Sequence, residues 1–108
     1  MNKINLHDLI AKVKKTWQIL DVVDIHDTAL RIAKIEGAYQ WHTHQQEDEL
    51  FIVLKGKVFI DTNRDGTIEL EEMEGYLVEK GVRHRSRSEK PAWVLLIEPK
   101  KTITLGEQ

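Results

Sequence analysis

The sequence predicts an all-β fold, a sandwich or a barrel, with one short helix at the N-terminus. About eight or nine short segments rich in bulky and β-branched residues are separated by turn signals of glycine, proline, asparagine and aspartate. Only one segment has its apolar residues at helical spacing. A chain of 108 residues is long enough for one modest core and too short for two. We therefore expect a single domain over residues 1–108.

The predicted helix covers residues 5–15. Asn5 can cap its N-terminus, because an asparagine side chain accepts a hydrogen bond from a free backbone amide of the first turn. The apolar positions of this segment are Leu6, Leu9, Ile10 and Val13. They recur every three or four residues and so share one helical face. We expect that face to pack over one end of a barrel.

The predicted barrel spans residues 17–105. Its strands are expected at 17–24, 29–35, 39–44, 50–54, 57–61, 67–70, 76–78 and 93–97. Pro91 is expected to end a polar loop before the last strong strand. The residues from Lys100 onward are expected to form one edge strand or to fray.

Composition excludes several classes of function. The formal net charge of −2 gives no electrostatic case for binding nucleic acid or an anionic membrane. No apolar run approaches the roughly 20 residues that span a bilayer. The absence of cysteine excludes disulfides and thiolate metal sites. The N-terminus lacks the apolar block of a secretory signal, so we expect a cytoplasmic protein.

Histidines and carboxylates gather around residues 42–49. His42 and His44 are separated by one residue, so on a β-strand both would point to the same side. Three carboxylates follow immediately, Glu47, Asp48 and Glu49, and each is a candidate partner. A third imidazole can come from His84, which lies in a glycine-containing turn region distant in sequence. Together these side chains make a plausible metal site.

The spacing of these residues resembles the first motif of the cupin superfamily. That motif runs from a glycine through His-x-His, three or four residues, Glu, six residues and Gly. The matching residues are His42, His44, Glu49 and Gly56. The distance from Gly37 to His42 is one residue shorter than in the usual form.

The second motif of that superfamily is also similar. It has a Gly, then Pro-x-Gly, two residues, His, three residues and Asn, and it is matched by Gly75, Gly81 and His84. Glu79 stands where Pro is expected and Ser88 where Asn is expected. In the family those two positions shape the turn and do not bind metal. The match covers roughly residues 37–97, so the chain resembles a small single-domain member.

The resemblance implies a fold, a site and a cofactor. The implied fold is a double-stranded β-helix, or jelly-roll barrel, with a short N-terminal α-helix. The implied ligands of one divalent cation are His42, His44, Glu49 and His84. Three neutral imidazoles and one carboxylate suit Fe, Mn, Ni, Co or Zn rather than Ca²⁺. An octahedral ion would keep two positions for water or a small-molecule substrate. Such families often form homodimers through exposed sheet edges.

Several side chains near these ligands are candidates to bind the substrate. Gln40 shares the face of His42 by parity, whereas Tyr39 would face the other way unless Gly37 bends the strand. Aromatic candidates for pocket walls are Phe51, Tyr76 and Trp93, although such residues are more often core.

Three functions remain open at this point. The first is a small metal-dependent enzyme that acts on a small polar organic molecule, with isomerase, dioxygenase or lyase chemistry undecided. The second is a non-catalytic module that binds a metal or a metabolite. The third comes from residues 61–72, which fit the calcium loop of an EF-hand at every ligand position, with Gly66 at the sixth. An EF-hand needs flanking helices, but residues 58–60 are strand-like, so we expect a β-hairpin there.

Arg83, Arg85 and Arg87 alternate around His84. They would form either an anion clamp at the barrel mouth or a solvated outer face paired with glutamates. Arginines that flank an inward histidine on a strand point outward. The outer face is therefore the favoured interpretation.

Overall fold

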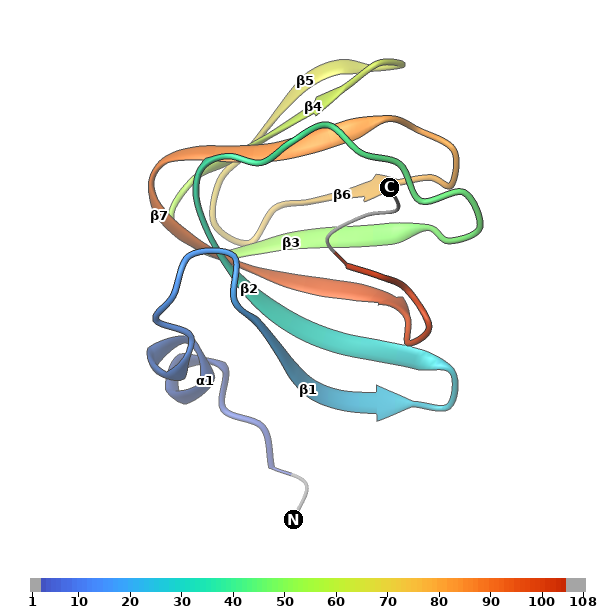
Figure 1. Cartoon of the computed structure of the whole chain (residues 1–108). Coiled ribbons are helices and arrows are strands. Elements are labelled where there is room, and N and C mark those ends of the chain that lie inside the picture. Colours follow the sequence, from blue (N-terminus) through green and yellow to red (C-terminus); the bar gives the residue numbers. More distant parts are fainter. Residues whose placement is uncertain (1–2, 105–108) are drawn as a thin grey trace.

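The computed structural model describes residues 3–104 as a β-barrel with a helix against its side (Figure 1). The helix, α1, spans Leu6–Lys12 and is shorter than the predicted 5–15. Asn5 is its N-cap, since the Asn5 side chain accepts a hydrogen bond from the Asp8 amide at 3.2 Å. Within residues 3–104, no helix is long and apolar enough to cross a membrane.

Seven strands form the barrel in the described part of the chain. They are β1 (Ile19–Ile25), β2 (Thr28–Ala38), β3 (Glu49–Lys55), β4 (Val58–Thr62), β5 (Gly66–Leu70), β6 (Gly75–Val78) and β7 (His84–Pro99). The hydrogen-bonded order is β1-β2-β7-β3-β6, and β4 pairs with both β5 and β7. Every pairing is antiparallel. The predicted all-β jelly roll is confirmed, with slightly fewer strands than expected.

β7 joins the two halves of the barrel. Its first part pairs with β4, and its later part pairs with β2 and β3. The prediction that Pro91 ends a loop is wrong, because β7 continues through this residue. The register between β2 and β7 skips from Ser88 to Ala92, so Pro91 lies where its nitrogen is not required to donate a ladder hydrogen bond.

The predicted strand at residues 39–44 and the possible edge strand after Lys100 are absent from residues 3–104. Residues 39–44 form an irregular connection in which His42 makes an isolated bridge to His84. Residues 100–104 form turns and coil. Leu105, the predicted end of the barrel, lies outside the described residues. The strand β2 extends further than predicted, to Ala38, because a bulge at Gly37 lets it continue past the bend.

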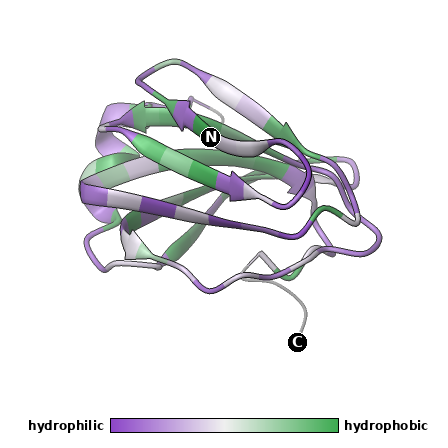
Figure 2. Ribbon diagram, turned by 90° about the horizontal axis from the view of Figure 1, so that it is seen from above, coloured by the Kyte–Doolittle hydropathy of each residue, from purple (hydrophilic) through white to green (hydrophobic). Residues whose placement is uncertain are grey.

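The apolar core divides into two clusters. Inside the barrel, facing strands contribute fully buried residues such as Val53 and Val94. The second cluster, around Val13, Ile32 and Leu95, lies beneath α1. Each buried aliphatic side chain contributes about 1.5–3 kcal/mol to stability. Figure 2 shows the hydrophobic residues concentrated along the strands and the hydrophilic ones in the connections.

Candidate metal centre

The four predicted ligands come from separate parts of the chain and meet inside the barrel. His42 and His44 lie in the connection between β2 and β3, Glu49 is the first residue of β3, and His84 is the first residue of β7. The backbones of His42 and His84 exchange two hydrogen bonds of 2.9 Å. The Gly81 amide donates to the His44 carbonyl at 2.8 Å, and its φ of 82° lies in the region that favours glycine.

The side chains of these residues converge closely enough to share one ion. One ligand atom from each lies within 4.8 Å of all the others. Glu49 Oε1 is 3.5 Å from Nε2 of both His44 and His84. The ring centroids of His42 and His84 are 4.4 Å apart. Atoms that bind one transition metal at about 2.1 Å lie about 3–4 Å from each other. The separations therefore leave room for an ion.

The burial of these four polar side chains costs free energy. All four residues are at most 8% exposed. The buried atoms without a hydrogen-bond partner include both ring nitrogens of His44, both carboxylate oxygens of Glu49 and Nε2 of His84. An unsatisfied buried polar group costs about 1–3 kcal/mol, and native proteins contain few of them. A cation among these atoms would satisfy those that face it.

Two of the imidazoles are already held in the tautomer that a metal requires. His42 Nδ1 lies 3.0 Å from the Gln40 carbonyl oxygen, and His84 Nδ1 lies 2.9 Å from that of Val82. A carbonyl oxygen only accepts, so Nδ1 carries the proton in each ring. The lone pair of Nε2 is then free to bind a metal ion.

The electrostatics of the cluster favour a negative Glu49 carboxylate with positive charge beside it. Burial lowers the pKa of His42 below its ordinary value. Burial also disfavours ionised Glu49, but the adjacent His44 and His84 hold the pKa of Glu49 below its ordinary value. Burial opposes charge on His44 as well, yet the Glu49 carboxylate raises the pKa of His44. A metal cation would supply the positive charge that this carboxylate attracts. The donor set fits Fe, Mn, Ni, Co or Zn.

Comparison with known proteins places the chain in a family. Residues 30–98 match the Cupin domain family. This chain is a cupin. It is also 35% identical over 106 residues to an uncharacterised protein of Bacillus subtilis (strain 168), YdbB, a match that covers 96% of this chain and 94% of YdbB.

Solved structures share the cupin fold of this chain. A cupin-2 domain containing protein from Shewanella frigidimarina superposes with a TM-score of 0.85 at 32% identity, over 89% of this chain and 93% of that one. A hydroquinone 1,2-dioxygenase from Sphingomonas sp. TTNP3 superposes with a TM-score of 0.73, over 83% of this cupin and 70% of that chain. Because its identity is 17%, it shows the fold alone.

A small cavity adjoins the candidate metal centre of the cupin barrel. It has a volume of about 30 Å³, and its lining includes His42, Glu49 and Phe51. The Phe51 ring centroid lies 6.3 Å from that of His84. Of the four residues expected to bind substrate, the structure brings Phe51 to this cavity.

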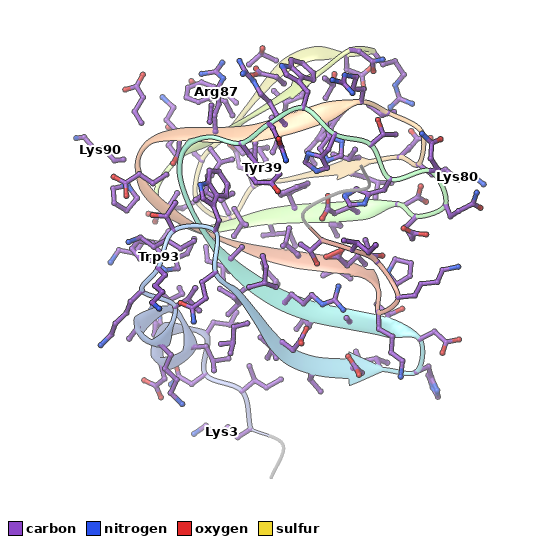
Figure 3. All side chains as sticks on the ribbon, in the orientation of Figure 1. Lys3, Tyr39, Lys80, Arg87, Lys90 and Trp93 are labelled. Atoms are coloured by element: carbon purple, nitrogen blue, oxygen red, sulfur yellow. The ribbon has the colours of Figure 1, made fainter. Side chains whose placement is uncertain are left out.

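The other three expected substrate-binding residues lie elsewhere. Gln40 is exposed, and it reaches His42 through its backbone carbonyl. The Tyr76 hydroxyl donates to the Asp65 carboxylate. Trp93 donates its indole N–H to the Val13 carbonyl at 2.8 Å, near α1, where Figure 3 also shows it. The parity argument for Gln40 fails because residues 39–44 are not a regular strand.

Tyr39 takes the position expected for Gln40. Its ring lies edge-on to His42 with centroids 5.3 Å apart, and it lines the same cavity. Figure 3 shows it between the ribbons of the barrel. The backbone bends at Gly37, whose φ is 77°, and the register with β7 shifts there. Gly37 is therefore the sequence signal that indicated this outcome.

Glu98 is a buried carboxylate that the sequence analysis missed. Its side chain is 0% exposed, and burial together with the nearby Glu49 raises its pKa to about 7. Glu98 Oε1 accepts a hydrogen bond from Thr104 at 2.9 Å and lies 3.5 Å from Arg31 Nη1. Oε2 is buried without a partner. On β7 Glu98 shares the parity of the core residue Leu96, which is the signal that could have identified it.

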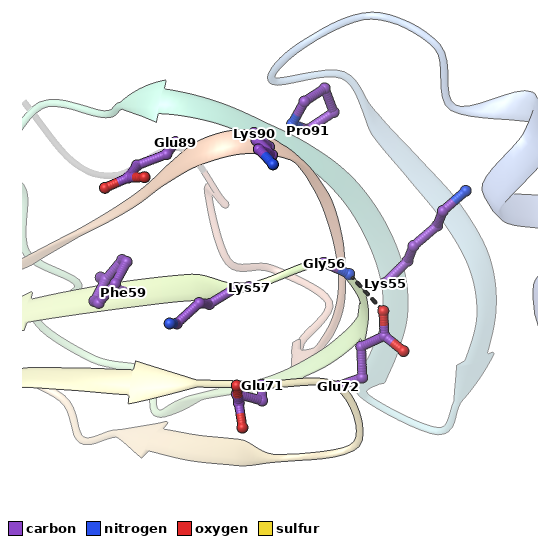
Figure 4. A pocket seen from close by; sticks show the side chains of 9 residues that line it. All are labelled: Lys55, Gly56, Lys57, Phe59, Glu71, Glu72, Glu89, Lys90 and Pro91. Atoms are coloured by element: carbon purple, nitrogen blue, oxygen red, sulfur yellow. Dashed lines mark hydrogen bonds between the residues drawn. The ribbon is translucent and has the colours of Figure 1, made fainter.

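A wider groove of about 780 Å³ lies away from the metal cluster (Figure 4). Its lining mixes lysines with glutamates, and the Gly56 amide donates to Glu72 at 2.9 Å across it. None of the four candidate ligands lines this groove. This groove is the larger of the two. We nevertheless take the smaller cavity as the candidate site, because the donor atoms of the four ligands converge beside it.

Residues 61–72 form the hairpin of β4 and β5, not an EF-hand loop, which needs flanking helices. Asp61, the first ligand position of that pattern, accepts hydrogen bonds from Arg85 and Arg87 at 2.8 Å and from Thr67 at 2.7 Å. Arg87 above all holds the pKa of Asp61 far below its usual range. Arg85 and Arg87 therefore pair with a carboxylate, as the favoured interpretation expected, but the carboxylate is that of Asp61 and not that of a glutamate.

Proposed function

We propose that this cupin binds one divalent transition-metal ion, Fe, Mn, Ni, Co or Zn, through His42, His44, Glu49 and His84. The observation that carries the proposal is the set of buried atoms without partners on three of these side chains. A metal bound there would polarise a substrate oxygen or activate a water molecule.

The cavity beside the cluster supports a small organic molecule as the substrate. His42 and Glu49 form its polar end, and most of the remaining walls are apolar, for example Ile35, Phe51 and Leu96. A ligand whose polar group lies toward the metal and whose remainder is apolar suits this lining. The expected small polar substrate is thereby narrowed to one with a single polar end.

Two groups besides the ligands favour an enzyme over a passive module. Tyr39 lines the cavity, and Glu98, whose pKa is raised to about 7 by burial and the nearby Glu49, accepts a hydrogen bond from Thr104 of the cavity wall. General acid–base chemistry needs such a group near neutral pH. The reaction type, whether isomerase, dioxygenase or lyase, is open. The alternative, a non-catalytic metal- or metabolite-binding module, is favoured by the small volume of about 30 Å³.

The homodimer and the cytoplasmic location are also proposals. β1 pairs only with β2 among the described strands, so its outer edge is open. Val23 and Ile25 on this strand are 37% and 60% exposed. An open edge of this kind supports pairing with a second copy.

Elemental analysis of protein purified without a metal-affinity tag tests the proposed function. We expect about one transition-metal ion per chain and a sharp loss in His42→Ala and His84→Ala, because each removes one of four ligands. His7→Ala is the matched control, since His7 is exposed on α1. A full metal load in both site variants would overturn the ligand assignment. Wild-type protein that stays empty after loading would favour an organic ligand in a non-catalytic module.

A further inference from the structure

The segment that follows β7 reaches the cavity beside the metal cluster through Thr104. In Figure 1 the chain turns back after β7 and runs beside the end of that strand. Thr104 lines the cavity together with His42 and Glu49. Through Thr104, the segment at residues 100–104 therefore supplies a part of the cavity wall that the barrel strands do not supply.

Arg31, on β2, holds this segment in place. Its Nη2 donates to the Lys100 carbonyl at 2.7 Å, and its Nη1 donates to the Thr102 carbonyl at 3.1 Å and to Thr104 Oγ1 at 3.0 Å. Its Nε donates to Asp21 on β1 at 2.8 Å. One guanidinium thus joins two strands of the barrel to three positions of the segment.

Glu98 completes the attachment. Thr104 Oγ1 donates to Glu98 Oε1 at 2.9 Å, so the threonine hydroxyl connects the arginine to the buried carboxylate. The segment lacks comparable apolar anchoring, because Ile103 is 63% exposed. A segment held by a few polar contacts opens at lower free energy than a strand held by a ladder.

A small molecule could enter this cavity only if some part of the structure moves. Small-molecule sites commonly have volumes of about 300–1,000 Å³, whereas this cavity has about 30 Å³. Most of the other lining residues belong to β2, β3 and β7, which are fixed by antiparallel ladders. Residues 100–104 are not part of a ladder.

We propose that residues 100–104 are a gate over the cavity, latched by Arg31 and Glu98 through Thr104. A small molecule reaches the metal side of the barrel when this latch opens. The gate depends on the proposed function for one premise, which is that the substrate would meet the metal in this cavity.

Chemical modification of His42 in metal-free protein tests the gate without relying on a bound metal. Diethyl pyrocarbonate reacts with a free imidazole nitrogen, and His42 lines the cavity whereas His7 is exposed. The ratio of the two modification rates, measured by peptide mass spectrometry, reports access to the cavity. Thr104→Val keeps the side-chain shape and removes the hydroxyl that joins Arg31 to Glu98.

We expect Thr104→Val to raise that ratio about fivefold to tenfold, as the loss of hydrogen bonds to charged partners predicts. Arg31→Lys should raise it further, because a single ammonium cannot replace the guanidinium contacts to Lys100, Thr102 and Thr104. Thr67→Val is the matched control, because Thr67 also donates its hydroxyl to a carboxylate, that of Asp61, in the remote hairpin. Its ratio should equal that of wild type.

The outcomes separate the gate from the metal site. Equal ratios in wild type and Thr104→Val would overturn the gate, even if elemental analysis finds a full metal load. A raised ratio in Thr104→Val alone among the threonine variants would support the gate, even if the protein binds no metal. A rise in Thr67→Val of the same size would also overturn it, because access would then follow general loosening.

Discussion

Asp61 and Glu49 are buried carboxylates in the same barrel, and their surroundings differ. Asp61 accepts hydrogen bonds from Arg85, Arg87 and Thr67, so its charge is balanced by the protein itself. Both oxygens of Glu49 are buried without a hydrogen-bond partner, and its neighbours are imidazoles. Asp61 therefore stabilises the hairpin, and Glu49 is available to bind a ligand.

The difference distinguishes a buried carboxylate that stabilises the fold from one that binds a ligand. A buried carboxylate without compensation costs several kcal/mol, so a stable fold keeps one only where something else is bound. Asp61 is close in sequence to a convincing metal motif but has protein partners. Glu49 has a less complete local motif, but its partners converge from distant strands. Whether the carboxylate oxygens have hydrogen-bond partners therefore distinguishes the two sites better than the local sequence motif does.

The largest expected effect is on the stability of metal-free protein. Asp61→Asn should lower the free energy of unfolding by about 2–3 kcal/mol, because it leaves two arginines, each about one-third exposed, without their shared carboxylate. Glu49→Gln should lower it by less than about 1 kcal/mol, since the imidazoles that hold down the pKa of Glu49 lie 3.5 Å from its Oε1 and form no hydrogen bond with it. Urea unfolding of both variants measures the contrast.

The same two variants should reverse their order in metal content. Asp61→Asn should retain the metal of wild type, and Glu49→Gln should lose most of it. A Glu49→Gln protein that is the less stable of the two without metal would contradict the distinction between the carboxylates.

The next expected effect is on acid stability. Because the pKa of folded Asp61 is depressed, its stabilisation is fully present above its unfolded pKa of about 3.9 and is lost as the pH falls below that value. Wild type should lose up to about 1.4 kcal/mol per pH unit there, beyond what Asp61→Asn loses. Urea midpoints measured from pH 5 down to pH 3 test this. If the urea midpoints of the two proteins fall in parallel as the pH is lowered, the arginines do not depress the pKa of folded Asp61.

Sequence reasoning was reliable where spacing along the chain determines the geometry. The fold class followed from short β-branched segments between turns, and the convergence of His42, His44, Glu49 and His84 followed from paired motifs. It was less reliable where the backbone departs from regular alternation. The connection at residues 39–44 is irregular, so parity placed Gln40 rather than Tyr39 beside the site.

Two other features were missed because they depend mainly on contacts between distant segments. The strand β7 tolerates Pro91 because its register with β2 skips there, which no local pattern reveals. Glu98 is buried because the segment at residues 100–104 and Arg31 cover it. A charged residue at an inward position of a strand is a signal, but its partner lies 67 positions earlier in the chain.

The smallest expected effect is that of calcium, for which the predicted change is none. The carboxylate of Asp61 is already engaged by Arg85 and Arg87, and the loop is flanked by β4 and β5. A calcium ion would have to displace two guanidinium groups and re-form the loop around itself. The melting temperature of metal-free protein should therefore be the same with and without calcium, in wild type and in Asp61→Ala. A rise in wild type that Asp61→Ala abolishes would show that the hairpin rearranges into a cation site, and the contrast between the two carboxylates would then be lost.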